Sequence, residues 1–489
     1  MAKTKFFLVL LAVVIPAKLF ASSPAECGAV QMPYQIDGAY EGHWLGYSVA
    51  GVGDLNGDGK ADFIVGAPAE SRIGSSCAYV YSGSDGSLLL EYCGPEYLGH
   101  SVAGAGDVNA DGKSDFVCGA PMGFGAADII SGADGSLLYR VSATQGISLL
   151  GNSVGGGEDV NGDGTPDFIV GAPDPSTFGG YGCALVYSGA DGSLLYRVDG
   201  GSLGDQMGHS VALLGDLNGD GKSEFAAGAR WTDVNGRINT GSVYVYSGAD
   251  ASLMYRKNGT SDAENFGWSL ANSGDVNADG KPDFAVGAVQ ADAAGLSNVG
   301  ALFVYSGVDG SLLLQLNGTS TGDQFGFSVA GAGDINGDGH ADVMVGAPGV
   351  TSSPLPSMGA AYVFSGQDGS LFYQMGGTEG IEWVGWAVAG LGDADGDGKG
   401  DFLVATPAAS MTTGWVRVFK SGSLFGDINS DGNFTPADIV SLMKTVFLDQ
   451  PLPCPDCAGD LNCDGTLSPT DVVAELNAVF QRIPAFCIL

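Results

Sequence analysis

The chain has 489 residues, too many for one ordinary hydrophobic core, so several domains or an array of repeats are expected. Only 15% of its residues are charged, yet its formal net charge is −36 at pH 7, which makes it a poor partner for nucleic acid or an anionic membrane. The 82 glycines, which follow no collagen-like period, predict many tight turns between short strands.

Residues 1–21 have the features of a secretory signal peptide. Lys3 and Lys5 precede an apolar run from Phe6 to Ile15, and Ala21 is a small residue suited to the position before the cleavage site. The run is too short for a permanent anchor, and no other stretch is long enough to span a bilayer. We therefore expect a protein that is secreted or attached to the cell surface, a setting in which its nine cysteines can form disulfides.

A nine-residue acidic motif then recurs seven times, at spacings of 52 to 59 residues. The first copy, "DLNGDGKAD", follows "GYSVAGVG" and precedes "FIVGAP", "YVYSG", an Asp-Gly turn and "SLLLEY". This order predicts four short strands per unit and no helix. Seven four-stranded units predict a β-propeller, with a linear β-solenoid as the alternative.

These units resemble the FG-GAP repeat of integrin α-subunits, over roughly residues 31–422. The "FG" half is clear at Phe266–Gly267 and Phe325–Gly326, and the "GAP" half is intact in four units but reads "GAR", "GAV" and "ATP" in the fourth, fifth and seventh. The resemblance implies an all-β, seven-bladed propeller with four-stranded blades. It also implies a cell-surface binding role without catalysis, and calcium in some of the blades.

The acidic motif itself has the spacing of a calcium-binding loop. Calcium takes about six to eight oxygen ligands in a flexible shell, and a glycine permits the sharp turn of such a loop. The first copy offers oxygens from Asp54, Asn56, Asp58, the Lys60 carbonyl and Asp62, whose carboxylate could contribute one oxygen or both. A turn without metal is the alternative for a single copy, but seven copies with one spacing favour metal.

The other six copies supply equivalent candidate ligands. The fourth ends in a glutamate, one methylene longer, and the seventh has a third-position aspartate instead of asparagine. The candidates are Asp107, Asn109, Asp111 and Asp115; Asp159, Asn161, Asp163 and Asp167; Asp216, Asn218, Asp220 and Glu224; Asp275, Asn277, Asp279 and Asp283; Asp334, Asn336, Asp338 and Asp342; and Asp393, Asp395, Asp397 and Asp401.

The pattern changes in residues 426–489, where a unit with a longer acidic loop and a helix-period apolar run occurs twice. This duplication resembles a type I dockerin, which implies a small α-helical domain with two EF-hand-like calcium loops and attachment to a cohesin. Calcium could then occupy up to nine sites in the chain. The candidate ligands are Asp427, Asn429, Asp431 and Asp438 in the first loop, and Asp460, Asn462, Asp464 and Asp471 in the second.

We therefore expect a calcium-loaded binding protein whose propeller contacts a protein or glycan and whose C-terminal domain binds a cohesin. The loop from Arg230, "RWTDVNGRINTG", is the candidate ligand surface because arginine and aromatic residues are enriched in binding hot spots. No catalytic residue is assigned, since His100 and His209 share a repeat position that other units fill with Tyr, Asn, Trp or Phe. The alternatives are a component of a polysaccharide-degrading complex, including a glycoside hydrolase, and a structural spacer.

Two further expectations concern pairing within the propeller. Cys77 and Cys93 flank a predicted hairpin at equal distances from Asp85, so they could form a disulfide; a small residue filling a tight site is the alternative for Cys77. The seventh unit lacks a fourth strand, and "YQIDG" near the N-terminus matches "YRVDG" at residues 196–200. Residues 31–38, with the strand at Tyr34–Asp37, should therefore close the seventh blade.

Overall fold

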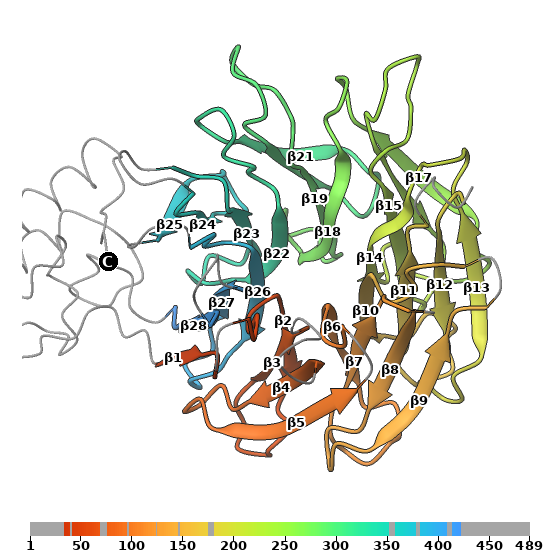
Figure 1. The fold of residues 1–489 in the computed structure, drawn as a ribbon, viewed down its shortest axis with the longest axis vertical. Coiled ribbons are helices and arrows are strands. Elements are labelled where there is room, and N and C mark those ends of the chain that lie inside the picture. The colour runs from red at the N-terminus through yellow and green to blue at the C-terminus, as the bar shows by residue number, and fades with distance from the viewer. Residues whose placement is uncertain are drawn as a thin grey trace, which may run out of the picture.

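The computed structural model describes residues 34–421, apart from 40–41, 69–75, 95–96, 124, 145–146, 175–179, 352–356, 378–381 and 408–412. The described residues form 28 β-strands in seven four-stranded antiparallel sheets. The sheets are arranged around a central axis as the blades of a propeller (Figure 1). This confirms the all-β, seven-bladed fold predicted from the repeats. The signal peptide and the dockerin-like segment 426–489 lie outside the described residues.

In each blade the first strand lies nearest the axis and the last at the periphery (Figure 1). Blades 1 to 4 consist of β2 (Ser48–Gly53), β3 (Asp62–Ala67), β4 (Ser76–Tyr81) and β5 (Leu88–Gly94); β6 (Ser101–Gly106), β7 (Asp115–Ala120), β8 (Ala126–Ile130) and β9 (Leu137–Ser142); β10 (Ser153–Glu158), β11 (Asp167–Ala172), β12 (Cys183–Tyr187) and β13 (Leu194–Asp199); and β14 (Met207–Gly215), β15 (Glu224–Ala229), β16 (Ser242–Tyr246) and β17 (Leu253–Asn258). Blades 5 to 7 consist of β18 (Phe266–Gly274), β19 (Asp283–Ala288), β20 (Ala301–Tyr305) and β21 (Leu312–Asn317); β22 (Ser328–Gly333), β23 (Asp342–Ala347), β24 (Ala360–Phe364) and β25 (Leu371–Gly376); and β26 (Ala387–Gly392), β27 (Asp401–Thr406), β28 (Trp415–Phe419) and β1 (Tyr34–Asp37).

The hydrophobic core is divided into layers between neighbouring blades. The second strand of every blade is buried along its whole length, which is why it reads as a continuous apolar run rather than an alternating one. Between blades 1 and 7, for example, Phe63 and Val65 of β3 share a cluster with Leu403 of β27 and Val418 of β28. Burial of such layers provides the main driving force for folding.

The inner strands contain small residues because they converge on the axis. A β-carbon at Gly104 of β6 would lie 2.9 Å from the carbonyl oxygen of Gly51 in β2, and one at Gly390 of β26 would lie 2.3 Å from that of Gly331 in β22. Larger side chains would push these strands apart. A cavity of about 400 Å³ remains between β2, β6, β10 and β14, lined mainly by glycine, alanine and valine.

The ring is closed by its N-terminal strand. β1 pairs antiparallel with β28, with Tyr34 opposite Val418 and Asp37 opposite Trp415, so it forms the outer strand of blade 7, the place expected from the sequence. The closure also links blade 7 to blade 1, since the Tyr34 hydroxyl donates a hydrogen bond of 2.8 Å to the Ser82 carbonyl. Equivalent tyrosines at 139, 196 and 255 donate to other carbonyls of the same turn in the next blade.

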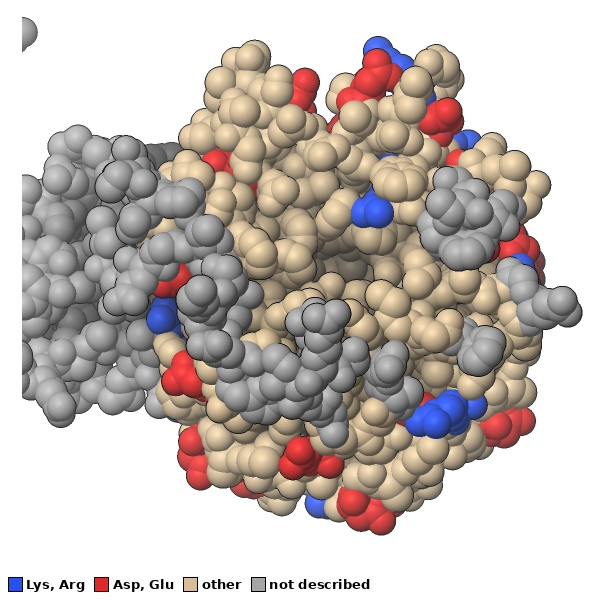
Figure 2. Space-filling view, viewed as in Figure 1, with Lys and Arg blue, Asp and Glu red and all other residues tan. Residues whose placement is uncertain are grey.

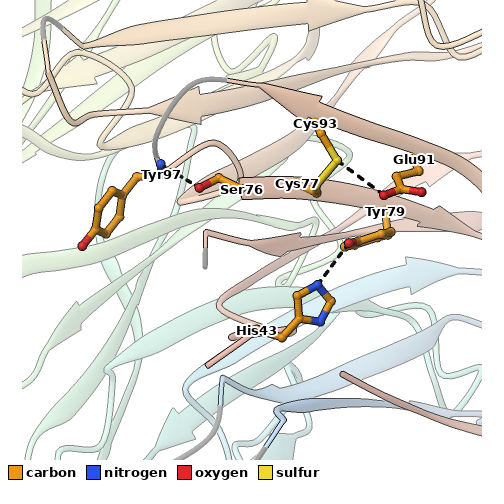
Figure 3. Close-up of a disulfide and its surroundings, with 7 residues drawn as sticks. All are labelled: His43, Ser76, Cys77, Tyr79, Glu91, Cys93 and Tyr97. Carbon is orange, nitrogen blue, oxygen red and sulfur yellow. Dashed lines mark hydrogen bonds between the residues drawn. A yellow bond between two sulfur atoms is a disulfide. The ribbon is translucent and has the colours of Figure 1, made fainter. Parts of the chain in front are cut away.

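Blade 1 contains a disulfide between its two outer strands. Cys77 of β4 and Cys93 of β5 lie directly opposite each other and are bonded (Figure 3), which confirms that prediction. Nearby, the Tyr97 N–H donates to Ser76 Oγ at 2.9 Å (Figure 3). Among the described cysteines, Cys118 and Cys183 are buried free thiols, and burial raises the pKa of both.

Candidate metal-binding loops and central face

Each acidic loop joins the first strand of its blade to the second and is curled by bonds between side chains and backbone. In the first loop, the Asp54 carboxylate accepts the N–H groups of Gly57 at 2.7 Å and Gly59 at 2.8 Å. Asn56 Oδ1 accepts the N–H of Asp58 at 2.8 Å. These side-chain oxygens accept hydrogen bonds from backbone N–H groups of the same loop, so the side chains at positions one and three point into the loop. A bound cation would require this orientation.

The ninth residue of each loop begins the second strand and is fully buried. Asp62 Oδ2 accepts the N–H groups of Leu55 at 2.9 Å and Asn56 at 3.2 Å, while Oδ1 accepts that of Gly83 at 3.1 Å. Asn56 Nδ2 also donates to Oδ1, at 3.5 Å. The carboxylate is thus tied both to its own loop and to the turn after β4.

Burial changes the protonation of these ninth-position carboxyls. Desolvation raises the pKa of Asp167, Asp283 and Asp401 to about 6 and that of Asp342 to about 7, and hydrogen bonds from backbone N–H groups oppose the rise. A nearby divalent cation favours the charged form of a carboxyl group. A cation bound in the loop would therefore favour the charged form of these buried carboxyl groups.

The seven loops differ in how their oxygens are arranged. Within the described residues, the loop of blade 7 gathers carboxylate oxygens of Asp393, Asp395 and Asp401 within 4.8 Å of one another. In the blade 4 loop, by contrast, the Lys281 ammonium from blade 5 lies 3.3 Å from Asp216 Oδ2 and 2.9 Å from the Asp216 carbonyl oxygen. A lysine therefore already neutralises part of the loop that carries the longer Glu224.

Loops of neighbouring blades are also joined through the backbone. The N–H of the eighth residue of one loop donates to the carbonyl of the first residue of the preceding loop in four blade pairs: Ser223 to Asp159, Ala341 to Asp275, Gly400 to Asp334 and Ala61 to Asp393, at 2.8 to 3.4 Å. These bonds link more than half of the neighbouring loop pairs on one face of the propeller. Ligands predicted in the two C-terminal loops lie outside the described residues.

The start of each inner strand, on the opposite face, carries a second sevenfold feature that the sequence analysis missed. A tight turn precedes the strand, closed in blade 1 by a bond of 3.2 Å from the Tyr47 N–H to the Trp44 carbonyl. The first residue of all seven turns has a left-handed φ of 56° or more without being glycine, a conformation that costs energy and is typical of functional surfaces. These residues are Trp44, Tyr97, Leu149, Gln206, Asn265, Gln324 and Trp383.

The last residues of these turns form a ring around the axis. Ring centroids lie 4.9 Å apart for Tyr47 and His100, 4.7 Å for Phe327 and Trp386, and 5.0 Å for His209 and Trp268. Burial lowers the pKa of His100 to about 4, so it is neutral near pH 7. Figure 2 shows one face of the propeller, hollowed at its centre, with most visible acidic side chains toward the rim.

Arg230 brings a positive charge to this ring. It occupies the position of the "GAP" proline, and its guanidinium lies 4.5 Å from the ring centroid of Trp268 and 4.9 Å from that of Trp231. Its Nε donates to Gln206 Oε1 at 2.7 Å. Sequence reasoning selected Arg230 and Trp231 but missed Trp268 and Gln206, which lie in other parts of the repeat and meet Arg230 only in the folded propeller.

Comparison with known proteins agrees with this architecture. The family model described as FG-GAP repeat matches residues 45–87, 98–139, 150–182, 207–246, 266–305 and 325–364. Six of the seven blades match the FG-GAP repeat. The matched FG-GAP segments fall in blades 1 to 6; blade 7, whose motif reads "ATP" and whose outer strand comes from the N-terminus, lies outside them.

Integrin α chains are among the relatives of this FG-GAP propeller. Integrin alpha-V of Gallus gallus is 32% identical over 217 residues, which cover 40% of this chain and 20% of the relative. Integrin alpha-5 of Xenopus laevis is 34% identical over 221 residues, covering 42% and 20%. The similarity thus spans about a fifth of the length of these relatives. The described part of the chain contains no helix with the length and apolar character needed to cross a bilayer.

Proposed function

We propose that this protein is an exported, calcium-loaded binding protein. Its propeller presents the central face to a protein or glycan ligand, and residues 426–489 attach it to a cohesin. The observation that carries this proposal is the placement of two sevenfold features at opposite ends of the inner strands. The acidic loops lie at one end, and the strained turns with their aromatic ring lie at the other.

The acidic loops support the calcium part of the proposal. In the first loop, Asp54, Asn56, Asp58, the Lys60 carbonyl and Asp62 would hold the ion, and the same positions would act in the other six blades. Bound calcium supplies positive charge and fixes the loop geometry. The ninth-position carboxylate would transmit this order to the blade, because it also ties the loop to the turn after the third strand.

The central face supports ligand binding rather than catalysis. Glycoside hydrolysis needs a pair of carboxyl groups about 5 to 10 Å apart on either side of the scissile bond. The seven ring positions hold aromatic residues, two histidines and Asn152, and no acid. Aromatic side chains beside an arginine are typical of the energetic centre of a binding interface.

A capture experiment with the full-length protein tests this function. Immobilised protein is incubated with surface proteins and cell-wall glycans of the source organism in calcium, washed, and eluted with EGTA. We expect a retained ligand that Trp268→Ala weakens, and a retained cohesin that Asp427→Asn with Asp460→Asn weakens independently. Turnover of a polysaccharide by the purified protein, lost on an acid-to-amide change outside the calcium loops, would contradict the proposal.

A further inference from the structure

Arg230 is a half-buried cation without an acidic partner. None of the ion pairs between described residues includes it, and its hydrogen bond to Gln206 uses only Nε–H. The two terminal NH₂ groups therefore have no acceptor among the described residues. Burial lowers the pKa of Arg230 to about 10, which reflects the cost of holding this charge away from water.

The aromatic contacts of Arg230 supply no hydrogen-bond acceptor to its guanidinium. Trp231 and Trp268 contact Arg230 through their ring faces, and such contacts stabilise the flat faces of the cation rather than its N–H edge. His209 packs edge-on against the same Trp268, and its buried Nε2 has no hydrogen-bond partner. Two groups able to donate hydrogen bonds thus lie on one tryptophan of the central ring without acceptors.

Comparison of the repeats shows how position 230 differs from the equivalent positions in other blades. Position 230 corresponds to the proline of "GAP" that is intact in blades 1, 2, 3 and 6, and to Val289 in blade 5. The arginine therefore adds a charge to a position that is uncharged in those blades. The strained turn at Gln206, with a φ of 59°, places the amide that orients Nε.

We propose that Arg230 forms a carboxylate-binding subsite on the central face, which accepts an aspartate or glutamate side chain of a protein ligand. The two terminal NH₂ groups would donate to the carboxylate. This inference rests on the proposed ligand-binding function and specifies the chemistry of the ligand. A planar guanidinium edge matches a planar carboxylate.

A protein carboxylate fits the surroundings of Arg230 better than an acidic sugar does. Arg230 itself covers one face of Trp231 and of Trp268, and His209 and Phe327 also contact Trp268. These rings are therefore not free platforms on which a sugar ring could stack. An extended acidic side chain needs only the terminal NH₂ groups, which have no acceptor among the described residues.

The test uses the full-length, calcium-loaded protein and the blocked amino acid N-acetyl-aspartate N-methylamide as the probe. Binding is followed by intrinsic tryptophan fluorescence, since Trp231 and Trp268 contact Arg230, and by saturation-transfer NMR of the probe. We expect saturable binding of the aspartate probe. The asparagine analogue and methyl glucuronide should each bind at least tenfold more weakly than the aspartate probe.

Three variants separate the subsite from general effects. Arg230→Pro restores the residue of the other blades, and Arg230→Gln removes the charge with less change to the backbone; both should reduce aspartate binding at least tenfold. Arg256→Gln is the matched control, because Arg256 lies over the Tyr244 ring at 5.1 Å on the outer strands of the same blade. It should bind like the wild type.

Several results would overturn the inference. Equal binding of the aspartate and asparagine probes, or wild-type binding by Arg230→Gln, would show that Arg230 does not hold a carboxylate. Tighter binding of the glucuronide would exclude the protein side chain as occupant. Absence of probe binding with normal calcium content and melting would reject the subsite alone, whereas absence of calcium from the purified protein would count against the proposed function itself.

Discussion

Arg140 in β9 holds the buried carboxylate of Asp128 in β8 through two hydrogen bonds of 2.6 Å, from Nε to Oδ1 and from NH2 to Oδ2. Tyr92 of the neighbouring blade donates a third bond to Asp128 Oδ2, at 2.9 Å. The carboxylate is buried at a strand position that in blades 3 and 5 is taken by Leu185 and Phe303. Blades 1 and 2 are thus joined by a polar contact at a position where blades 3 and 5 have an apolar residue.

Removing one partner of this pair should destabilise the propeller. Asp128→Ala leaves the arginine and the tyrosine hydroxyl without their acceptor, and we expect a loss of roughly 2 kcal/mol, below the ~3–5 kcal/mol of a fully buried pair because Arg140 is partly exposed. Urea denaturation measures it. Asp128→Leu combined with Arg140→Leu should recover most of the loss, and an equal or larger loss in the double variant would contradict this account.

Deleting residues 31–38 should destabilise the whole propeller rather than fray one end. The deletion removes β1, exposes the hydrogen-bonding edge of β28, and uncovers the cluster that contains Tyr34 and Ile36. We expect a loss of about 3 kcal/mol or more, from two apolar side chains and the lost backbone bonds. A truncated protein with the melting temperature and calcium content of the full chain would show that closure through β1 is not required.

Removing the disulfide should lower stability without disturbing the blade. Cys77→Ala with Cys93→Ala opens a 16-residue loop, for which about 3 kcal/mol is expected from chain entropy. Alanine fits the site, since Ala126, Ala301 and Ala360 occupy it in other blades. Denaturation with and without dithiothreitol provides the check: the reductant should destabilise the wild type and leave the variant unchanged.

His100 should make stability fall as the solution is acidified. Its folded pKa is about 4, below the usual value of about 6.5, so between these values the unfolded chain binds a proton that the folded chain does not. The stabilisation is complete above pH 6.5 and is lost toward pH 4, by up to about 1.4 kcal/mol per pH unit. His100→Phe, a residue found at the same position in blade 6, should lose less stability than the wild type between pH 7 and 5.

This comparison needs saturating calcium, because the metal-free ninth-position carboxyls act in the opposite direction. Their raised folded pKa values make the folded chain bind protons first, so metal-free protein should gain stability as pH falls through about 7 to 6. Identical pH slopes for wild type and His100→Phe would contradict the role given to His100.

The repeat pattern allowed much of the fold to be predicted, but it did not predict the contacts between repeats. Seven equally patterned units predict blades, and the match of "YQID" to "YRVD" locates the closing strand. The strained turns gave no signal because their first residues are not glycine. The contact of Arg230 with Trp268 joins different blades, and local sequence patterns carry no information on such packing.

In the acidic loops, some contacts within a single blade were also not predictable from the sequence. Spacing identified Asp62 as a candidate ligand, but its bond to the Gly83 N–H comes from a turn 21 residues later. The same side chain therefore serves the loop and the blade, which only the folded arrangement reveals.

Calcium-dependent stability of the full-length protein, measured together with bound metal, tests the central claim most directly. Extracellular modules bind calcium with dissociation constants of about 0.1–1 mM, so 10 mM calcium should add about 1.4 to 2.7 kcal/mol per filled site relative to excess EGTA. We predict several bound calcium ions and a clearly higher melting temperature in calcium. Asp393→Asn with Asp401→Asn should reduce both, since these residues belong to the acidic cluster of blade 7. An unchanged melting curve in EGTA, with no calcium retained by the untreated protein, would contradict the account.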